Sequence, residues 1–348
     1  MHPQEISQSS LQIPPQIAMQ QMIKMMTGYW LTQTIYVAAK LGIADRLQDG
    51  AKSCEELATE TKTHTRSLYR LMRALASEGI FAETEPGYFT LTPLATVLVS
   101  DVPGSARASA IMLAEELYQC WGLLMYSVQT GESAFNRLYG MNRFQYYAQN
   151  PEVSHIYDRA MTEMSGTDQH GIVSGYDFSS IRQLVDVGGG HGSLIATILK
   201  ANPIMKGVLF DLAPAIESAK ELIKSEGVAQ RCEVVSGDFF ESVPSGGDAY
   251  ILKWVIHNWD DKQAIAILKN CHRAMEKKGK LLLAERVITP GNDAFLGKFI
   301  DLNILAIWPG GCERTEAEYR SLFEAAGFHL TKIVPTRSDM SIIEGVPV

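Results

Sequence analysis

Several features that would identify common protein classes are scarce or absent in this chain of 348 residues. It has five cysteines and no C-x-x-C pair, so neither a zinc site nor a disulfide framework is indicated. No apolar run approaches the roughly 20 residues of a membrane span, and the start of the chain lacks the pattern of a secretory signal. We therefore expect a soluble, cytoplasmic protein without a metal.

Positive charge is also in short supply. Lys and Arg number 31 against 39 Asp and Glu, which gives a formal net charge of −8. Since such a chain is a poor partner for nucleic acid or an anionic membrane, we expect it to bind neither. Apolar residues, by contrast, make up 46% of the chain, which is ample for packed cores. The length exceeds one typical domain and favours two.

The stretch LVDVGGGHG, residues 184–192, combines a buried strand, an acidic strand end and a glycine-rich turn. Gly188 and Gly190 permit positive φ and let backbone N–H groups approach a ligand at the next helix N-terminus. A dinucleotide fingerprint would need a third glycine at position 193, where this chain has Ser193. Taken alone, the motif is equally compatible with an ordinary glycine turn.

The acidic residue before the glycines, Asp186, distinguishes between two kinds of cofactor. A carboxylate would repel a pyrophosphate, whereas it would attract a sulfonium or an amino-acid ammonium. The charge of Asp186 therefore favours S-adenosylmethionine over a dinucleotide.

Acidic residues also follow the next two predicted strands. A strand over 206–211 ends at Asp211, about 20 residues beyond the glycines, where a carboxylate can bind the ribose hydroxyls of an adenosine. A strand over 232–235 leads to Asp238 and Phe239, which offer an acceptor for the adenine amino group and an aromatic face for its ring. Each acid alone is more often a solvated residue. Successive strand ends meet at one sheet edge, so the acids together predict an adenosine site.

A fourth predicted strand, 249–254, leads into LKWVIHNWDD, which contains His257. A histidine with a pKa of about 6.5 is largely neutral at pH 7 and can accept a proton from a hydroxyl. Alone, His257 would more often be a core or helix-start residue. Its place past a strand end, at the edge of the cofactor acids, predicts a general base.

Six ordered blocks support a resemblance to a known family: DVGGGHG, FDLAPAI, GDFF, LKWVIHNWDD, LLLAERVITP and PGGCERT. The chain resembles the S-adenosylmethionine-dependent O-methyltransferases of the plant caffeic acid and flavonoid type, most of all their bacterial members acting on polyketides and other aromatic metabolites. The resemblance covers most of the chain. It implies methyl transfer to a hydroxyl, expected to be phenolic, of an aromatic small molecule. A relative that methylates nitrogen or carbon, or catalyses another reaction on this fold, is the alternative.

The resemblance also implies roles for individual residues. Glu285 and Glu313 match the acids that flank and orient the family's catalytic histidine, here His257. Further positions match the family's cofactor contacts: Ser165, Gly188, Gly190, Asp211, Asp238, Phe239, Lys253 and Trp259. Among these, Ser165 matches the position that binds the methionine carboxylate, and Trp259 is expected to form an aromatic wall at the adenine.

The acceptor site is expected to draw on a linking helical region, 104–176, with Tyr157 and Met161 among its contributors. Trp308 stands where plant members carry polar residues, which puts monolignols in doubt and favours a flatter, more apolar acceptor. Asn303 could hydrogen-bond an acceptor hydroxyl, although an asparagine on a helix face is as often solvated.

The first hundred residues predict a separate module. A helix over 18–41 precedes a capping box at Ser53 and Glu56, a helix over 65–79 and a hairpin over 81–91, which together suggest a winged helix. In the resembled family this module is a dimerisation domain, so the resemblance implies a homodimer.

A DNA-binding regulator is the rival interpretation of this module. Arg66, Arg70 and Arg73 form a basic stripe at helical spacing. Residues 1–100 nevertheless hold eight Lys and Arg against nine Asp and Glu, without the basic excess of a groove-binding domain. We therefore expect the stripe to be a solvated or salt-bridged face.

The predicted fold is α/β, with a Rossmann-like, seven-stranded, largely parallel methyltransferase sheet that ends in an antiparallel hairpin over 328–335 and 340–346. The predicted organisation has four parts: a disordered tail over 1–16, a winged-helix-like dimerisation domain over 17–103, linking helices over 104–176 and the methyltransferase domain over 177–348.

Overall fold

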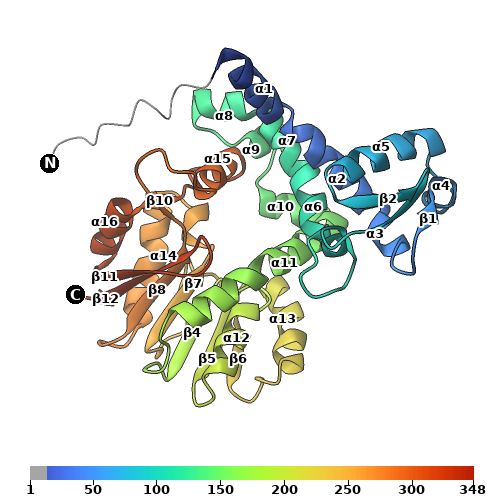
Figure 1. The fold of residues 1–348 in the computed structure, drawn as a ribbon. Coiled ribbons are helices and arrows are strands. Elements are labelled where there is room, and N and C mark those ends of the chain that lie inside the picture. Colours follow the sequence, from blue (N-terminus) through green and yellow to red (C-terminus); the bar gives the residue numbers. More distant parts are fainter. Residues whose placement is uncertain (1–13) are drawn as a thin grey trace. The chain divides into compact units, whose positions relative to one another are not determined.

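The structure, a computed structural model, describes residues 14–348 and separates into two compact units, unit 1 up to Ala114 and unit 2 from Glu115 to Val348 (Figure 1). The predicted disordered tail lies outside the described residues except for its last three positions. No helix within residues 14–348 has both the length and the apolarity that crossing a bilayer requires.

Unit 1 contains a winged-helix module. Its elements are α1 Pro15–Met26, α2 Gly28–Leu41, α3 Ile43–Arg46, β1 Lys52–Ser53, α4 Cys54–Thr61, α5 Thr65–Ser77, β2 Phe81–Glu85, β3 Tyr88–Leu91, the 3-10 turn η2 Ala95–Leu98 and α6 Arg107–Ala114. The predicted capping box is present, since Ser53 Oγ accepts from the Glu56 N–H at 3.2 Å. The predicted wing is present too, as β2 and β3 pair antiparallel.

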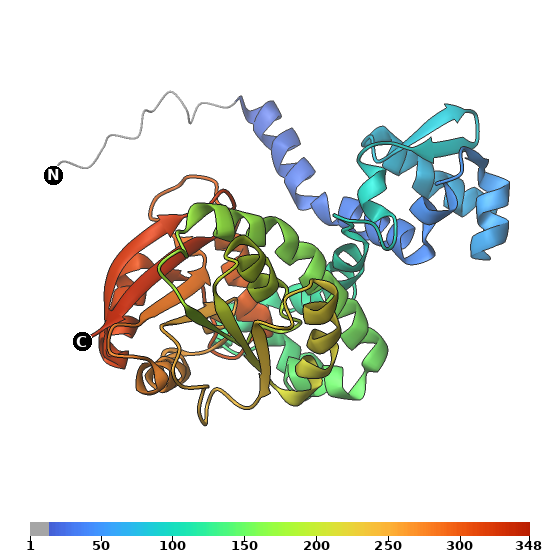
Figure 2. The same ribbon diagram turned by 90° about the horizontal axis from the view of Figure 1, so that it is seen from below.

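The first predicted helix is divided in two. Thr27 separates α1 from α2, and its hydroxyl donates to the Ile23 carbonyl at 2.8 Å just before Gly28. A back-bonded threonine followed by a glycine favours a helix boundary over a continuous helix. Within unit 1, Figure 2 shows α1 projecting away from the winged-helix module, and α1 has no buried residue.

Unit 2 begins with a helical region and continues as an α/β sheet. The helices are α7 Glu116–Gly122, α8 Leu124–Thr130, α9 Ala134–Tyr139, α10 Arg143–Gln149 and α11 Pro151–Gly175. The remaining elements are β4 Gln183–Val187, α12 Ser193–Ala201, β5 Lys206–Asp211, α13 Ala213–Ser225, β6 Cys232–Ser236, β7 Ala249–Lys253, the 3-10 turn η3 Ile256–Asn258, α14 Asp261–Ala274, β8 Lys280–Glu285, β9 Val287–Ile288, α15 Gly297–Ile307, β10 Arg314–Thr315, α16 Glu316–Ala326, β11 Phe328–Pro335 and β12 Ser341–Pro347.

The main sheet has the predicted seven strands, and their order is β11-β12-β8-β7-β4-β5-β6. Only β12 runs against the others, since it pairs antiparallel with both β8 and β11. Alternate side chains of β4 point to opposite faces: Leu184 joins the core beneath α11, α12 and α13, whereas Val185 joins the core beneath α14 and α16. Helices on both faces bury the strands and leave the strand ends as the accessible edge.

Candidate active site

Four parallel strands end at one edge of the main sheet and deliver predicted site residues there. Asp186 lies near the end of β4, whereas Asp211, Lys253 and Glu285 are the last residues of β5, β7 and β8. The chain leaves β4 for β5 on one side and later adds β7 on the other. This edge therefore contains the topological switch point, where open α/β sheets bind ligands.

The glycine-rich turn after β4 folds tightly against its neighbours. Gly188 has φ +70° and Gly190 has φ +56°, both in the left-handed region that favours glycine. A Cβ added at Gly188 would lie 2.8 Å from a methyl group of Val255. The Gly190 N–H donates to Asp211 Oδ2 at 2.8 Å, so the last residue of β5 fixes the position of the turn at the sheet edge.

Asp186 lies beneath this turn, because a Cβ on Gly189 would meet its carboxylate at 2.7 Å. The residue is 1% exposed, and its Oδ2 has no hydrogen-bond partner among the described residues. Burial raises the pKa of Asp186 to about 7, against the nearby positive charge of Lys253. Asp186 is thus buried beneath the glycine turn, and its role at the cofactor stays a prediction.

The predicted adenosine residues gather on the next two strand ends. Asp211 is half-buried, and burial raises the pKa of its carboxyl. Asp238 accepts from the Phe240 N–H at 2.8 Å, which orders the loop after β6. The ring centroids of Phe239 and Trp259 lie 6.0 Å apart, edge to face. Sequence reasoning missed one support of this aromatic pair, since Asn270 Nδ2 donates to the Phe239 carbonyl at 2.7 Å.

Ser165 and Lys253, 88 residues apart in sequence, meet directly. Lys253 Nζ donates to Ser165 Oγ at 2.7 Å, which joins the end of β7 to the long helix α11. Burial lowers the pKa of Lys253 to about 8, although Asp168 and Asp186 oppose the shift. An ammonium and a hydroxyl held together in this way form a suitable pair of donors for a carboxylate.

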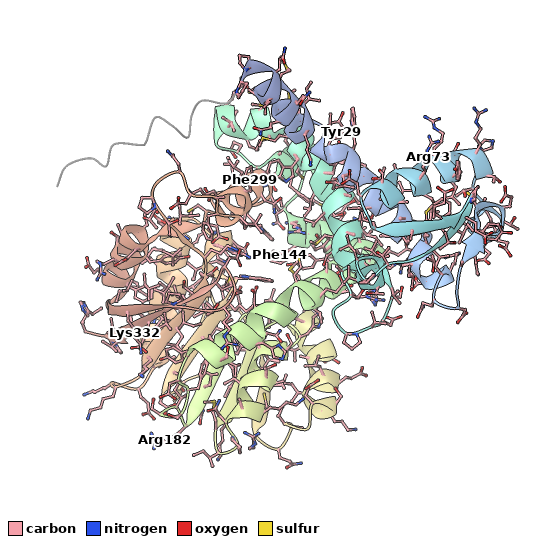
Figure 3. All side chains as sticks on the ribbon, in the orientation of Figure 1. Tyr29, Arg73, Phe144, Arg182, Phe299 and Lys332 are labelled. Carbon is pink, nitrogen blue, oxygen red and sulfur yellow. The ribbon has the colours of Figure 1, made fainter. Side chains whose placement is uncertain are left out.

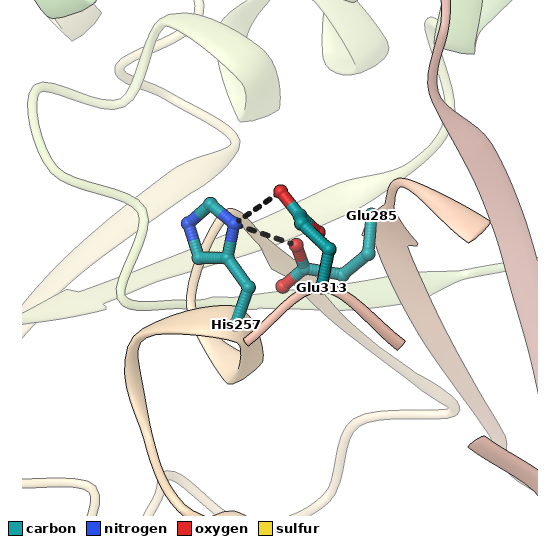
Figure 4. Close-up of side chains that lie close together, drawn as sticks. All are labelled: His257, Glu285 and Glu313. Carbon is teal, nitrogen blue, oxygen red and sulfur yellow. Dashed lines mark hydrogen bonds and ion pairs between the residues drawn. The ribbon is translucent and has the colours of Figure 1, made fainter. Parts of the chain in front are cut away.

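His257, Glu285 and Glu313 form a buried cluster (Figure 4). His257 Nδ1 lies 3.0 Å from Glu313 Oε1 and 3.6 Å from Glu285 Oε2. The other Glu285 oxygen accepts the N–H groups of Val255 and Ile256 at 3.0 and 2.9 Å. One ring nitrogen of the histidine, Nδ1, thus faces two carboxylates, and Nε2 is the opposite nitrogen of the ring.

Two arginines that sequence reasoning missed hold this cluster in place. Arg286 lies with Nη1 3.7 Å from Glu313 Oε1 and donates through Nε to Asp339 at 2.8 Å. Arg314 is 1% exposed and donates to the carbonyls of Ile256 and Trp259, on either side of His257. The sequence did contain a signal for both arginines, because Glu285 and Glu313 are each followed directly by an arginine.

A short parallel ladder brings the two Glu-Arg pairs together. β9 and β10 pair with Arg314 opposite Val287, outside the main sheet. The Glu313 N–H also donates to Asp301 Oδ1 on α15 at 2.8 Å, which sequence reasoning did not anticipate. Glu313 is therefore held next to His257 by an ordered backbone rather than by a free loop.

The predicted acceptor residues lie on α11 and α15. The ring centroids of Tyr157 and Tyr147 lie 4.7 Å apart, and the Arg143 guanidinium lies 4.6 Å from the Tyr157 centroid. Met161 is half-buried one turn along α11. Asn303 Oδ1 accepts from the Trp121 indole at 2.9 Å, so the structure gives its carbonyl a protein partner.

Trp308 completes this aromatic surface at the end of α15. It is 7% exposed, and its ring centroid lies 4.8 Å from that of Phe144, labelled in Figure 3. Aromatic faces of this kind suit a planar ligand.

Comparisons with known proteins decide the family. Residues 121–329 match the model of the O-methyltransferase domain, and residues 23–101 match that of the O-methyltransferase dimerisation domain. The chain belongs to the O-methyltransferase family. It is 44% identical over 327 residues to the phenazine O-methyltransferase PhzM of Lysobacter antibioticus, which covers 94% of this chain and 96% of that protein.

Further relatives extend the comparison. A 3-amino-4-hydroxybenzoate 4-O-methyltransferase of Streptomyces cremeus is 38% identical, with 92% of this chain and 88% of the relative covered. The crystal structure of LaPhzM superposes with a TM-score of 0.92 at 44% identity, over 95% of this chain and 99% of that one. A phenazine-1-carboxylate N-methyltransferase of Pseudomonas aeruginosa is 31% identical, over 91% of this chain and 94% of the relative.

The O-methyltransferase uses S-adenosylmethionine, and solved relatives contain this cofactor or its demethylated product. The donor set at the sheet edge fits the molecule. The carboxylate of Asp211 suits the ribose diol, and the paired rings of Phe239 and Trp259 suit the adenine. Lys253 and Ser165 suit the amino-acid carboxylate.

As the pH is lowered, the O-methyltransferase is expected to lose activity at a pH above about 6.5, the pKa of an unperturbed histidine. Burial lowers the pKa of His257, but the charges of Glu285 and Glu313 more than reverse this, and the net shift is upward. A histidine must be neutral to accept a proton, so the predicted role of His257 as general base implies that kcat/KM falls as the pH drops through this raised pKa. A profile of kcat/KM against pH measures this fall at low pH, which is the acid limb of the profile.

The Glu313→Gln variant provides the control for this profile. Removing one carboxylate lowers the pKa of His257, so the acid limb should move to lower pH with the same acceptor. A limb that stays in place would show that another group titrates.

Removal of metal ions is expected to leave the O-methyltransferase fully active. His257, Glu285 and Glu313 do offer ligand atoms within 4.8 Å of one another. However, Nδ1 already lies at hydrogen-bond distance from Glu313, and the Arg286 guanidinium beside that carboxylate repels a cation. Turnover after EDTA treatment and dialysis is the measurement. A loss that Mg²⁺ or Zn²⁺ restored would assign the cluster to a metal instead.

Proposed function

We propose that His257 is the general base of this O-methyltransferase and that its acceptor is a hydroxyl, expected to be phenolic, on a planar aromatic small molecule. One observation carries the assignment of the base. His257 is buried at the cofactor edge with Nδ1 held by Glu313 and Glu285, so a single ring nitrogen is left for the substrate.

The hydrogen bond to Glu313 supports a specific tautomer. An ionised carboxylate can only accept, so the proton on the neutral imidazole belongs to Nδ1, and Nε2 carries the lone pair. When the acceptor O–H bond breaks, Nε2 takes the proton and the ring becomes an imidazolium. The adjacent charges of Glu285 and Glu313 stabilise that cation.

The remaining chemistry is a displacement. When bound, S-adenosylmethionine supplies an electrophilic methyl group whose bond to sulfur breaks as the acceptor oxygen forms its new bond to carbon. The chain's own contribution is alignment, since positioning two bound reactants can supply about 7 to 11 kcal/mol. Lys253 and Ser165 would bind one end of the cofactor, and Asp211 the other.

The side chains predicted to form the acceptor site support a planar aromatic acceptor. Tyr157 and Trp308 present aromatic rings, while Tyr157, Met161 and Ser165 follow one face of α11 at four-residue spacing. This face connects the proposed acceptor contacts to the proposed cofactor contact. The named relatives act on a phenazine and on a hydroxybenzoate, which agrees with a flat aromatic substrate.

The experiment that tests this function is release of S-adenosylhomocysteine by the purified protein with paired acceptors. Hydroxyphenazines, hydroxybenzoates and naphthols are compared with the amines that carry an amino group in place of the hydroxyl. Mass spectrometry and NMR then locate the methyl group. Methylation confined to the hydroxyl compounds supports the proposal. Because one relative is an N-methyltransferase, product formed mainly from the amines would reverse the choice of acceptor.

We further propose that the chain functions as a cytoplasmic homodimer, in which the dimerisation module of one chain meets that of another. All five cysteines are unbridged thiols, in keeping with that compartment. Large apolar side chains are exposed along α1 and the start of α2: Ile17, Met19, Met22, Ile23, Met25, Met26, Tyr29, Trp30 and Leu31. Such a patch, rich in adaptable methionine, is typical of a protein interface.

The double variant Met25→Glu with Trp30→Glu is expected to be monomeric, because it places two charges in an apolar interface. Light scattering should give half the mass of the wild-type protein. Lys24→Glu is the matched control, since it adds an acid at a polar position of the same helix. A wild-type monomer, or a double variant that stays dimeric, would contradict the proposed interface.

A further inference from the structure

Trp254 has a backbone conformation that a tryptophan rarely adopts. Its φ is +55°, in the left-handed region, which is unfavourable for a residue with a Cβ. Within residues 14–348, the other non-glycine residues with positive φ are Lys62 and Asp101, both exposed. Trp254 is half-buried and directly precedes the loop of the base, and strain at such a place points to a functional constraint.

The left-handed turn redirects the backbone toward Glu285. The Trp254 N–H still donates to the Ala284 carbonyl at 3.3 Å, which continues the ladder of β7 on β8. The next two N–H groups, of Val255 and Ile256, both donate to one Glu285 oxygen. In an extended strand successive N–H groups point to opposite sides, so the turn at Trp254 is what directs the Val255 N–H to the β8 side, where the Trp254 N–H already points. The helical conformation of Val255, with φ −107° and ψ −54°, then lets the Ile256 N–H reach the same carboxylate oxygen.

The indole of Trp254 lies between the two functional clusters. Lys253 Nζ is 3.8 Å from the ring centroid, and the Arg286 guanidinium is 5.7 Å from it. The indole N–H donates to Met340 Sδ at 3.2 Å, which fixes the ring in its plane. One side chain thus contacts the lysine that pairs with Ser165 and the arginine that flanks Glu313.

We propose that Trp254 is a positioning residue with two separable parts. Its left-handed backbone aims His257 at the two glutamates, and its indole face holds Lys253 toward Ser165 and the cofactor carboxylate. The first part rests on the proposed function, because it acts through His257 as base. The second part acts on cofactor binding and stands independently of the acceptor.

Glycine and alanine at position 254 separate the two parts. Glycine adopts the left-handed conformation freely and removes the indole, so Trp254→Gly should weaken S-adenosylhomocysteine binding about tenfold and leave the acid limb of kcat/KM unchanged. Alanine keeps the backbone cost without the packing that sustains it. Trp254→Ala should therefore weaken binding equally and also move the acid limb to lower pH, as Nδ1 leaves the carboxylates.

Calorimetric titration with S-adenosylhomocysteine measures the first effect, and the pH profile measures the second. Trp254→Phe keeps an aromatic face under Lys253 and should lose less affinity than either variant, which preserves the test if the smaller residues fold poorly. Lys62→Ala is the matched control, a left-handed residue at the end of α4 that is expected to change neither quantity.

The outcomes distinguish this inference from the proposed function. Wild-type affinity in both the glycine and alanine variants would overturn the role of the indole. Equal acid limbs in those variants would overturn the role of the backbone. If His257→Ala were fully active, the assignment of the base would fail, whereas the effect of Trp254 on cofactor affinity would still be measured.

Discussion

His257→Ala is expected to lower kcat by about 100-fold or more, the usual scale for a lost general base, without weakening S-adenosylmethionine binding. The two effects separate because the residues proposed to bind the cofactor do not contact the imidazole: Lys253 pairs with Ser165, whereas His257 pairs with Glu313. Steady-state turnover measures the first effect, and calorimetric titration measures the second.

Two variants frame this experiment. Glu285→Gln keeps an oxygen for the two backbone N–H groups but removes one charge beside the imidazolium, so a smaller loss with unchanged cofactor affinity is expected. His329→Ala removes an exposed histidine on β11 and should leave kcat unchanged. Full activity in His257→Ala would remove this residue from the mechanism, and collapse of cofactor binding in Glu285→Gln would make Glu285 structural.

The second large effect is expected at Asp211. Replacement by alanine should raise the Kd for S-adenosylmethionine about 10- to 100-fold, the range for losing hydrogen bonds to a charged group. Asp211 also accepts the Gly190 N–H at 2.8 Å, so alanine would loosen the glycine turn as well. Calorimetric titration at constant pH is the measurement.

Asp211→Asn separates the two contributions. Asparagine retains an oxygen for the Gly190 N–H but loses the charge, so its Kd should lie between those of the wild type and the alanine variant. Asp177→Ala, which removes an exposed carboxylate that only caps a local turn at Ser179, is the control. A Kd in Asp211→Ala within twofold of the wild type would exclude a ribose contact.

The sequence was sufficient to predict the strands of the main sheet and most of the residues at the edge where they end. The predicted boundaries of β5 agree with the structure, because an apolar run ending in Asp211 marks both the buried strand and the point where it ends. The predicted parallel direction of these strands then brings their last residues, Asp211, Lys253 and Glu285, to one edge of the sheet.

Other parts of the site depend on contacts that no local pattern encodes. Arg314 reaches carbonyls 55 and 58 residues away, so its role follows only from the folded chain. Asp186 was predicted to favour the cofactor through its charge, and its position beneath Gly189 is visible only in the structure, since strand alternation does not say how a turn folds over the last residues of a strand. The left-handed turn at Trp254 opposes the ordinary preference of its residue type and is visible only in the structure.

Helix α11 determines which kinds of sequence change this enzyme can tolerate. Tyr157, Met161 and Ser165 follow one face of a single 25-residue helix, so the helical pitch sets the interval between the proposed acceptor contacts and the proposed cofactor contact. Inserting one residue between Met161 and Ser165 would rotate one group relative to the other by about 100° and separate them by about 1.5 Å more. We therefore expect substitutions along this face to change which acceptor is methylated, and insertions or deletions within it to move the acceptor hydroxyl out of line with the methyl group.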